Sequence, residues 1–61
     1  MIDRVILTTG HNSQELSLDQ FLDLPLNERI QLILERAATF YRGDTVIERQ
    51  DAMRYLRTVK R

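Results

Sequence analysis

His11, Ser13 and Glu15 are the residues whose types could together perform nucleophilic catalysis. They supply a base, a hydroxyl group and a carboxylate, which is the combination used in acyl transfer. Residues at alternate positions of an extended or turning loop need not converge, however, and no group that could stabilise an oxyanion is recognisable. We therefore predict an exposed loop histidine, no catalytic residues and a protein that is not an enzyme.

Asp19 and Asp23 are the carboxylates best placed to share a metal ion, because residues four apart lie on one face of a helix. A hard cation needs about six oxygen ligands, and the spacing of an EF-hand is missing. The chain has no cysteine and one histidine, which makes a structural zinc site improbable. Gly10 and Gly43 are isolated and form no phosphate-binding loop. We predict no metal site and no cofactor.

A basic stripe is the most informative surface feature of the sequence. On a helix over residues 48–60 it aligns Gln50, Arg54 and Arg57 with Arg61, at spacings of three or four residues. A solvated face that offsets the negative end of the helix dipole would look the same. We predict that the stripe binds an acidic protein surface, because the forked guanidinium group suits carboxylates. Binding of a nucleic acid through its phosphates is the alternative.

The composition limits the class of protein. The chain has 61 residues and a formal net charge of zero, which predicts a single small domain with no overall attraction to nucleic acid or to anionic lipid. No segment approaches the roughly 20 apolar residues of a membrane span, and the first seven residues lack the apolar stretch of a signal peptide. We predict a cytoplasmic protein with no membrane partner.

The elements that position these residues begin with a strand over residues 2–9, which is rich in β-branched side chains. Ser17 and Gln20 have the spacing of a capping box, which predicts a helix starting at Ser17. That helix must end after about two turns, because Pro25 moves Leu24 away from helical angles.

A longer amphipathic helix is predicted from Pro25 to about Gly43. Its inner face would carry most of the apolar residues, namely Leu26, Ile30, Ile33, Leu34, Ala37, Phe40 and Tyr41. Residues 39–42 and 45–47 could instead form two short strands joined at Gly43-Asp44. A capping box of Thr45 and Glu48 could also open the next helix there. We prefer a short extended segment at 45–47, able to pair with the N-terminal strand, followed by a helix over residues 48–60.

These elements together predict a mainly α, helical fold: an N-terminal strand, a short helix and then a two-helix hairpin. A chain this short buries too little surface for easy stability, so we predict an intertwined or strand-paired homodimer. Its contacts would come from the strand, the long helix and an outlying leucine, namely Val5, Leu7, Leu32, Phe40 and Tyr41. For function we predict a small regulator or adaptor acting through protein contacts; the alternative is a small nucleic-acid-binding regulator using the basic helix.

Overall fold

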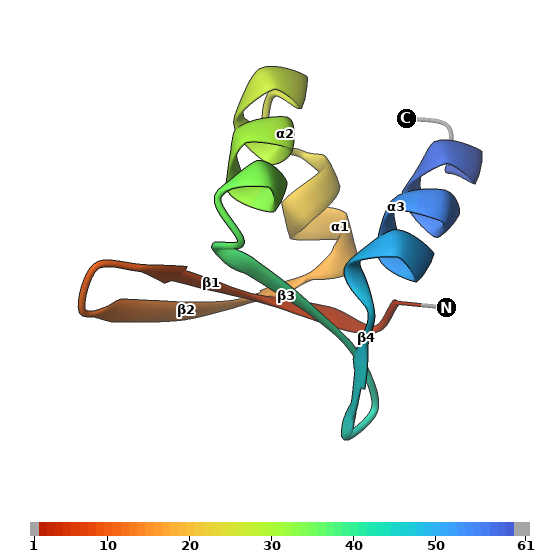
Figure 1. Cartoon of the computed structure of the whole chain (residues 1–61), viewed down its shortest axis with the longest axis horizontal. Helices are drawn as coiled ribbons and strands as arrows, with labels where there is room; N and C mark the ends of the chain where they lie inside the picture. The colour runs from red at the N-terminus through yellow and green to blue at the C-terminus, as the bar shows by residue number, and fades with distance from the viewer. Residues whose placement is uncertain (1, 60–61) are drawn as a thin grey trace.

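Strands and helices alternate in groups along the chain, as the computed structural model shows for residues 2–59 (Figure 1). The strands are β1 (Arg4–Thr9), β2 (Asn12–Ser17), β3 (Ala38–Arg42) and β4 (Thr45–Ile47). The helices are α1 (Leu18–Leu22), α2 (Leu26–Leu34) and α3 (Arg49–Thr58). The strands form one four-stranded antiparallel sheet in the order β2-β1-β3-β4. The prediction of a mainly α, helical protein is therefore wrong, and the fold is α+β.

Two hairpins build the sheet, and each turns at a glycine. Gly10 lies between β1 and β2, Gly43 lies between β3 and β4, and both have a φ of 61°. A positive φ at the first position of a two-residue turn is typical of type II′ hairpins, and glycine adopts it without steric cost. The hairpin alternative for residues 39–47 is thus confirmed. The preferred pairing of residues 45–47 with the N-terminal strand is wrong, because β4 pairs with β3.

The N-terminal strand occupies the centre of the sheet. Val5 lies opposite Leu16 on one side and opposite Phe40 on the other. Both edges of β1 are thereby filled from within the chain, so the predicted pairing of this strand with a second copy is wrong. The error arose at β2, where Leu16 is the single large apolar residue and the pattern does not resemble a strand. As an edge strand, β2 can leave its other side chains in water.

The capping box that predicted α1 is confirmed. Ser17 Oγ accepts a hydrogen bond from the backbone N–H of Gln20 at 3.1 Å, and Gln20 Oε1 accepts one from the backbone N–H of Ser17 at 2.9 Å. Ser17 is also the last residue of β2, so this one residue ends a strand and begins a helix. The cap therefore fixes the direction in which the chain leaves the sheet.

Replacing Ser17 with alanine should lower the free energy of unfolding by about 1 kcal/mol, because the N–H of Gln20 loses its acceptor. Urea unfolding followed by circular dichroism measures the change. Ser13→Ala, on an exposed position of the same strand, is the control and should change stability by less than about 0.5 kcal/mol. Equal stabilities for the two variants would contradict the capping role.

The predicted long helix ends early, at Leu34. The backbone N–H of Arg36 donates to Ile33 O at 3.1 Å and that of Ala37 donates to Leu32 O at 2.8 Å, which together form a Schellman motif. Arg36 has a φ of 57°, a left-handed conformation that costs a residue with a side chain roughly 1 kcal/mol. This stop lets Ala38–Arg42 form β3, although Phe40 and Tyr41 fit the helical apolar pattern equally well.

The helices lie on one side of the sheet, and the core lies between (Figure 1). At its centre the rings of Phe21 in α1 and Phe40 in β3 meet edge to face, with centroids 5.5 Å apart and planes at 87°. Val5 from β1 and Ala52 from α3 are fully buried beside them. The core thus joins both hairpins to the first and last helices.

The opposite side of the sheet is held together by Arg4. Its Nη1 donates to Glu15 Oε1 of β2 at 2.9 Å, and its guanidinium group lies 4.7 Å from the ring centroid of Tyr41 in β3. Its Nη2 also donates to Gly43 O at 3.3 Å, while Asp3 Oδ2 accepts the N–H of Gly43 at 2.7 Å. Asp3 and Arg4 therefore link β1 to β2, to β3 and to the turn at Gly43.

Candidate functional site

The three residues that could together act in catalysis lie in the turn between β1 and β2 or on β2 itself. His11 is exposed in the turn between β1 and β2, and Ser13 is exposed on the edge strand β2. The carboxylate of Glu15 is bound by Arg4. The arrangement consequently gives Glu15 a role in tying β2 to the centre of the sheet.

Asp19 lies in the first turn of α1 and Asp23 is the residue that ends this helix. Across residues 2–59, no group of three or more histidine, cysteine or acidic side chains is positioned to hold a metal ion. Over the same residues, no helix is both long enough and apolar enough to span a membrane.

The five side chains predicted to form a dimer contact are largely used inside the chain. Val5 and Phe40 belong to the buried core, and Leu7 and Leu32 are half-buried against it. Tyr41 is half-buried and lies under the guanidinium group of Arg4. The structure does not bring these five residues together on one surface.

The basic stripe is retained in part on α3. Gln50, Arg54 and Arg57 are exposed there, and Arg61 lies outside the described residues. Arg57 differs from the other two because it lines a groove next to α2. The stripe thus borders a concave surface that the sequence did not reveal.

An apolar groove of about 300 Å³ runs between α2 and α3. It is lined by residues of α1, α2 and α3, namely Phe21, Leu26, Arg29, Ile30, Ile33, Met53, Leu56 and Arg57. Three large apolar side chains in it are exposed, by 63% at Leu26, 48% at Ile30 and 37% at Met53. Single exposed apolar residues are ordinary, but a group of them in one groove is typical of a binding surface.

The groove exists because α2 is rotated relative to the predicted orientation. Ile33 is buried and Leu32 packs against the core, whereas Leu26, Ile30 and Leu34 face outward. Leu32 is the one large apolar residue on the polar side of the predicted helix. The sequence does show that the apolar residues of this helix spread over a wide arc around its axis. One sheet cannot cover the whole of such an arc, so some of these residues must stay exposed.

Arg29 adds a polar feature to this apolar surface. Its Nε atom is buried and has no hydrogen-bond partner among residues 2–59. A buried donor without an acceptor costs about 1–3 kcal/mol. Arg29 and Arg57 both line the groove, and none of the described residues that line it is acidic. The groove therefore combines exposed apolar side chains with two cations that lack a counter-charge within it.

Comparison of the chain with protein-family models, with curated proteins and with solved structures gave no significant match.

Proposed function

We propose that this protein is a non-enzymatic interaction module that binds an acidic, amphipathic segment of another protein in the groove between α2 and α3. The observation that carries this proposal is that Arg29 and Arg57 place two guanidinium groups in a groove whose other lining residues are apolar, with no acidic residue among the described residues that line it. A carboxylate from a bound segment would accept hydrogen bonds from these guanidinium groups and neutralise their charge.

The apolar part of the groove sets the shape of the ligand. Leu26 and Ile30 are one helical turn apart on α2, and Met53 faces them from α3. An amphipathic helix presents its own apolar residues at intervals of three or four, which matches a surface of this kind. Its insertion would cover side chains that are now in contact with water, and the removal of their apolar surface from water favours binding.

The charges on the rim set the sign of the ligand. Arg57 and Arg54 continue the positive charge of Arg29 along the exposed side of α3. Arginine binds carboxylates through two parallel hydrogen bonds, and such complementarity increases both specificity and the association rate. This is the acidic protein partner predicted from the basic stripe, with the docking position moved into the groove.

Binding can be measured by fluorescence anisotropy with a labelled peptide of about 18 residues, or five helical turns. The peptide carries leucine at every third or fourth position and glutamate elsewhere. Ile30→Glu should weaken binding at least tenfold, which corresponds to about 1.4 kcal/mol, because it places a carboxylate in the apolar groove. Leu34→Glu makes the same change on the same helix at a residue that is 67% exposed and does not line the groove. This control should bind like the unaltered protein.

A peptide with lysine in place of glutamate tests the charge requirement and should bind at least tenfold more weakly at low ionic strength. Equal affinities of Ile30→Glu and Leu34→Glu for the acidic peptide would refute the groove as the site. Light scattering on the same proteins tests the predicted homodimer. If the unaltered protein is a dimer and Ile30→Glu is a monomer, the groove binds a second copy of the chain instead. Salt-dependent binding of duplex DNA, lost on replacing Arg54 and Arg57 with glutamine, favours the nucleic-acid alternative.

A further inference from the structure

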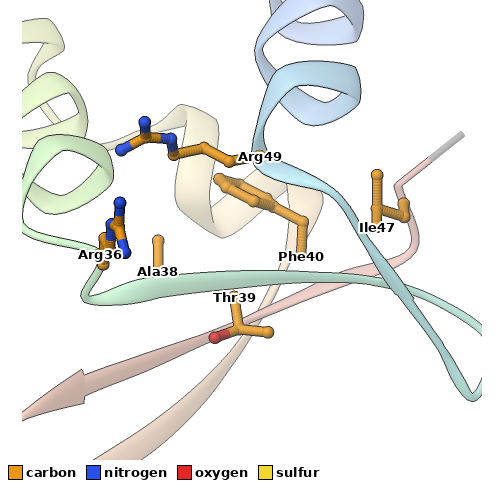
Figure 2. Close-up of a pocket in the computed structure, with 6 residues that line it drawn as sticks. All are labelled: Arg36, Ala38, Thr39, Phe40, Ile47 and Arg49. Atoms are coloured by element: carbon orange, nitrogen blue, oxygen red, sulfur yellow. The ribbon is translucent and has the colours of Figure 1, made fainter.

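A second cavity, of about 340 Å³, lies where the end of α2 and the start of α3 approach β3. It is lined by Arg36, Ala38, Thr39, Phe40, Ile47 and Arg49. Figure 2 shows Arg36 and Arg49 on the same side of β3 as Ala38 and Phe40, while the Thr39 side chain points to the opposite side. Two guanidinium groups thus share one cavity whose floor is apolar.

Arg36 stands at a position where its side chain is a disadvantage to the backbone. It is the left-handed residue of the Schellman motif after α2, with a φ of 57°, and glycine is the residue usually found there. The Arg36 side chain is exposed, and its guanidinium group has no ion pair or hydrogen bond within residues 2–59 that would compensate for this cost. Unfavourable backbone conformations of this type are often retained where the side chain has a functional role.

Arg49 is also unfavourably placed. It is the first residue of α3, where the helix dipole has its positive end and a cation is disfavoured. The preceding residue, Glu48, gives this helix no side-chain cap, and Arg49 forms no ion pair with any other described residue. The two carboxylates near this end, Glu48 and Asp51, line a different cavity together with Ile2 and Tyr55. The cavity of Arg36 and Arg49 is therefore lined by positive charge without a negative counterpart.

We propose that Arg36 and Arg49 bind a phosphate group, either as free phosphate or on a small phosphate monoester. A phosphate placed between the two guanidinium groups accepts paired hydrogen bonds from each and neutralises both charges. It also interacts favourably with the positive end of α3. The apolar floor leaves room for the organic part of a monoester beside Ala38 and Ile47. This site is separate from the groove between α2 and α3, and the proposal of a phosphate site does not depend on the proposed function.

The test is thermal unfolding of the full chain against increasing inorganic phosphate or phenyl phosphate, with ionic strength held constant by chloride. Four proteins are compared: the unaltered chain, Arg36→Gly, Arg49→Gln and the control Arg54→Gln, which changes an exposed arginine of α3 outside the cavity. Without phosphate, Arg36→Gly should melt about 4–8 °C higher, because glycine removes the backbone cost at this position. Phosphate stabilises folded proteins in general, so the measured quantity is the difference between proteins.

With phosphate present, the unaltered chain and Arg54→Gln should show the same increase in melting temperature. Arg36→Gly and Arg49→Gln should show apparent affinities at least about tenfold weaker, because each lacks a charged, forked donor. A response to both compounds assigns the site to free phosphate, and a response to phenyl phosphate alone assigns it to a monoester. An increase that is equal in all four proteins, or absent from the unaltered chain, overturns the proposal.

Discussion

Replacing Phe40 with alanine should lower the free energy of unfolding of the chain by about 3–5 kcal/mol. The Phe40 side chain is 2% exposed and contacts Phe21 edge to face from the middle of β3. Removing a buried phenyl ring costs about 3–5 kcal/mol, because the cavity that remains cannot close completely. At roughly 0.05–0.15 kcal/mol per residue, a chain of 61 residues has about 3–9 kcal/mol in total. The substitution therefore removes between about a third and all of the free energy of unfolding.

Urea unfolding followed by circular dichroism measures this loss. Tyr41→Ala is the matched control, since it removes an aromatic ring from the next residue of the same strand, on the opposite side of the sheet. Tyr41 is only half-buried, and its loss removes chiefly the contact with Arg4, so it should cost about 1 kcal/mol. If the two variants were equally stable, the assignment of the core to the helix-covered side of the sheet would be wrong.

Replacing Ala52 with aspartate should have a comparably large effect, at least about 3 kcal/mol. Ala52 is fully buried where α3 meets the core residues, so the new carboxylate would need both space and a partner there. The buried residues around it are hydrophobic, which leaves the charge uncompensated. We expect α3 to detach from the sheet or the whole chain to unfold.

The circular dichroism signal at 222 nm during urea unfolding distinguishes this effect from a general response to added charge. Gln50→Asp introduces the same carboxylate two residues earlier, on the exposed side of α3. Near the start of a helix an acidic residue is mildly favourable, so this control should stay within about 0.5 kcal/mol of the unaltered protein. A stable, fully folded Ala52→Asp would mean that α3 does not pack on the core through this residue.

The parts of the fold that were predictable from sequence are those set by local chemistry. The capping box of Ser17 and Gln20 identified the start of α1, whereas the Gly43-Asp44 turn predicted the second hairpin only as an alternative to the preferred single extended segment. The parts that failed depend on distant partners. β2 is a strand because β1 lies beside it, and β3 is a strand because Arg36 ends α2, although the apolar spacing around Phe40 also suits a helix.

The candidate sites were less predictable than the fold. The basic residues of α3 were recognised, but the groove beside them requires knowing that α2 turns Leu26 and Ile30 outward. The phosphate site requires Arg36 and Arg49 to share a cavity, and these residues belong to separate elements on either side of a hairpin. Periodicity shows that a helix has an apolar side, but the sheet decides which part of a wide apolar arc it covers.

The central position of β1 has a consequence for protein synthesis. The hairpin of β1 and β2 can form as soon as it emerges from the ribosome, but one edge of β1 stays open until β3 has been translated. Asp3 must likewise wait for Gly43, 40 residues further along the chain. A nascent chain arrested before β3 would thus expose the unpaired edge of β1, and such an edge recruits other chains. Rapid translation of the segment between β2 and β3 would shorten the period during which the nascent chain can aggregate through this edge.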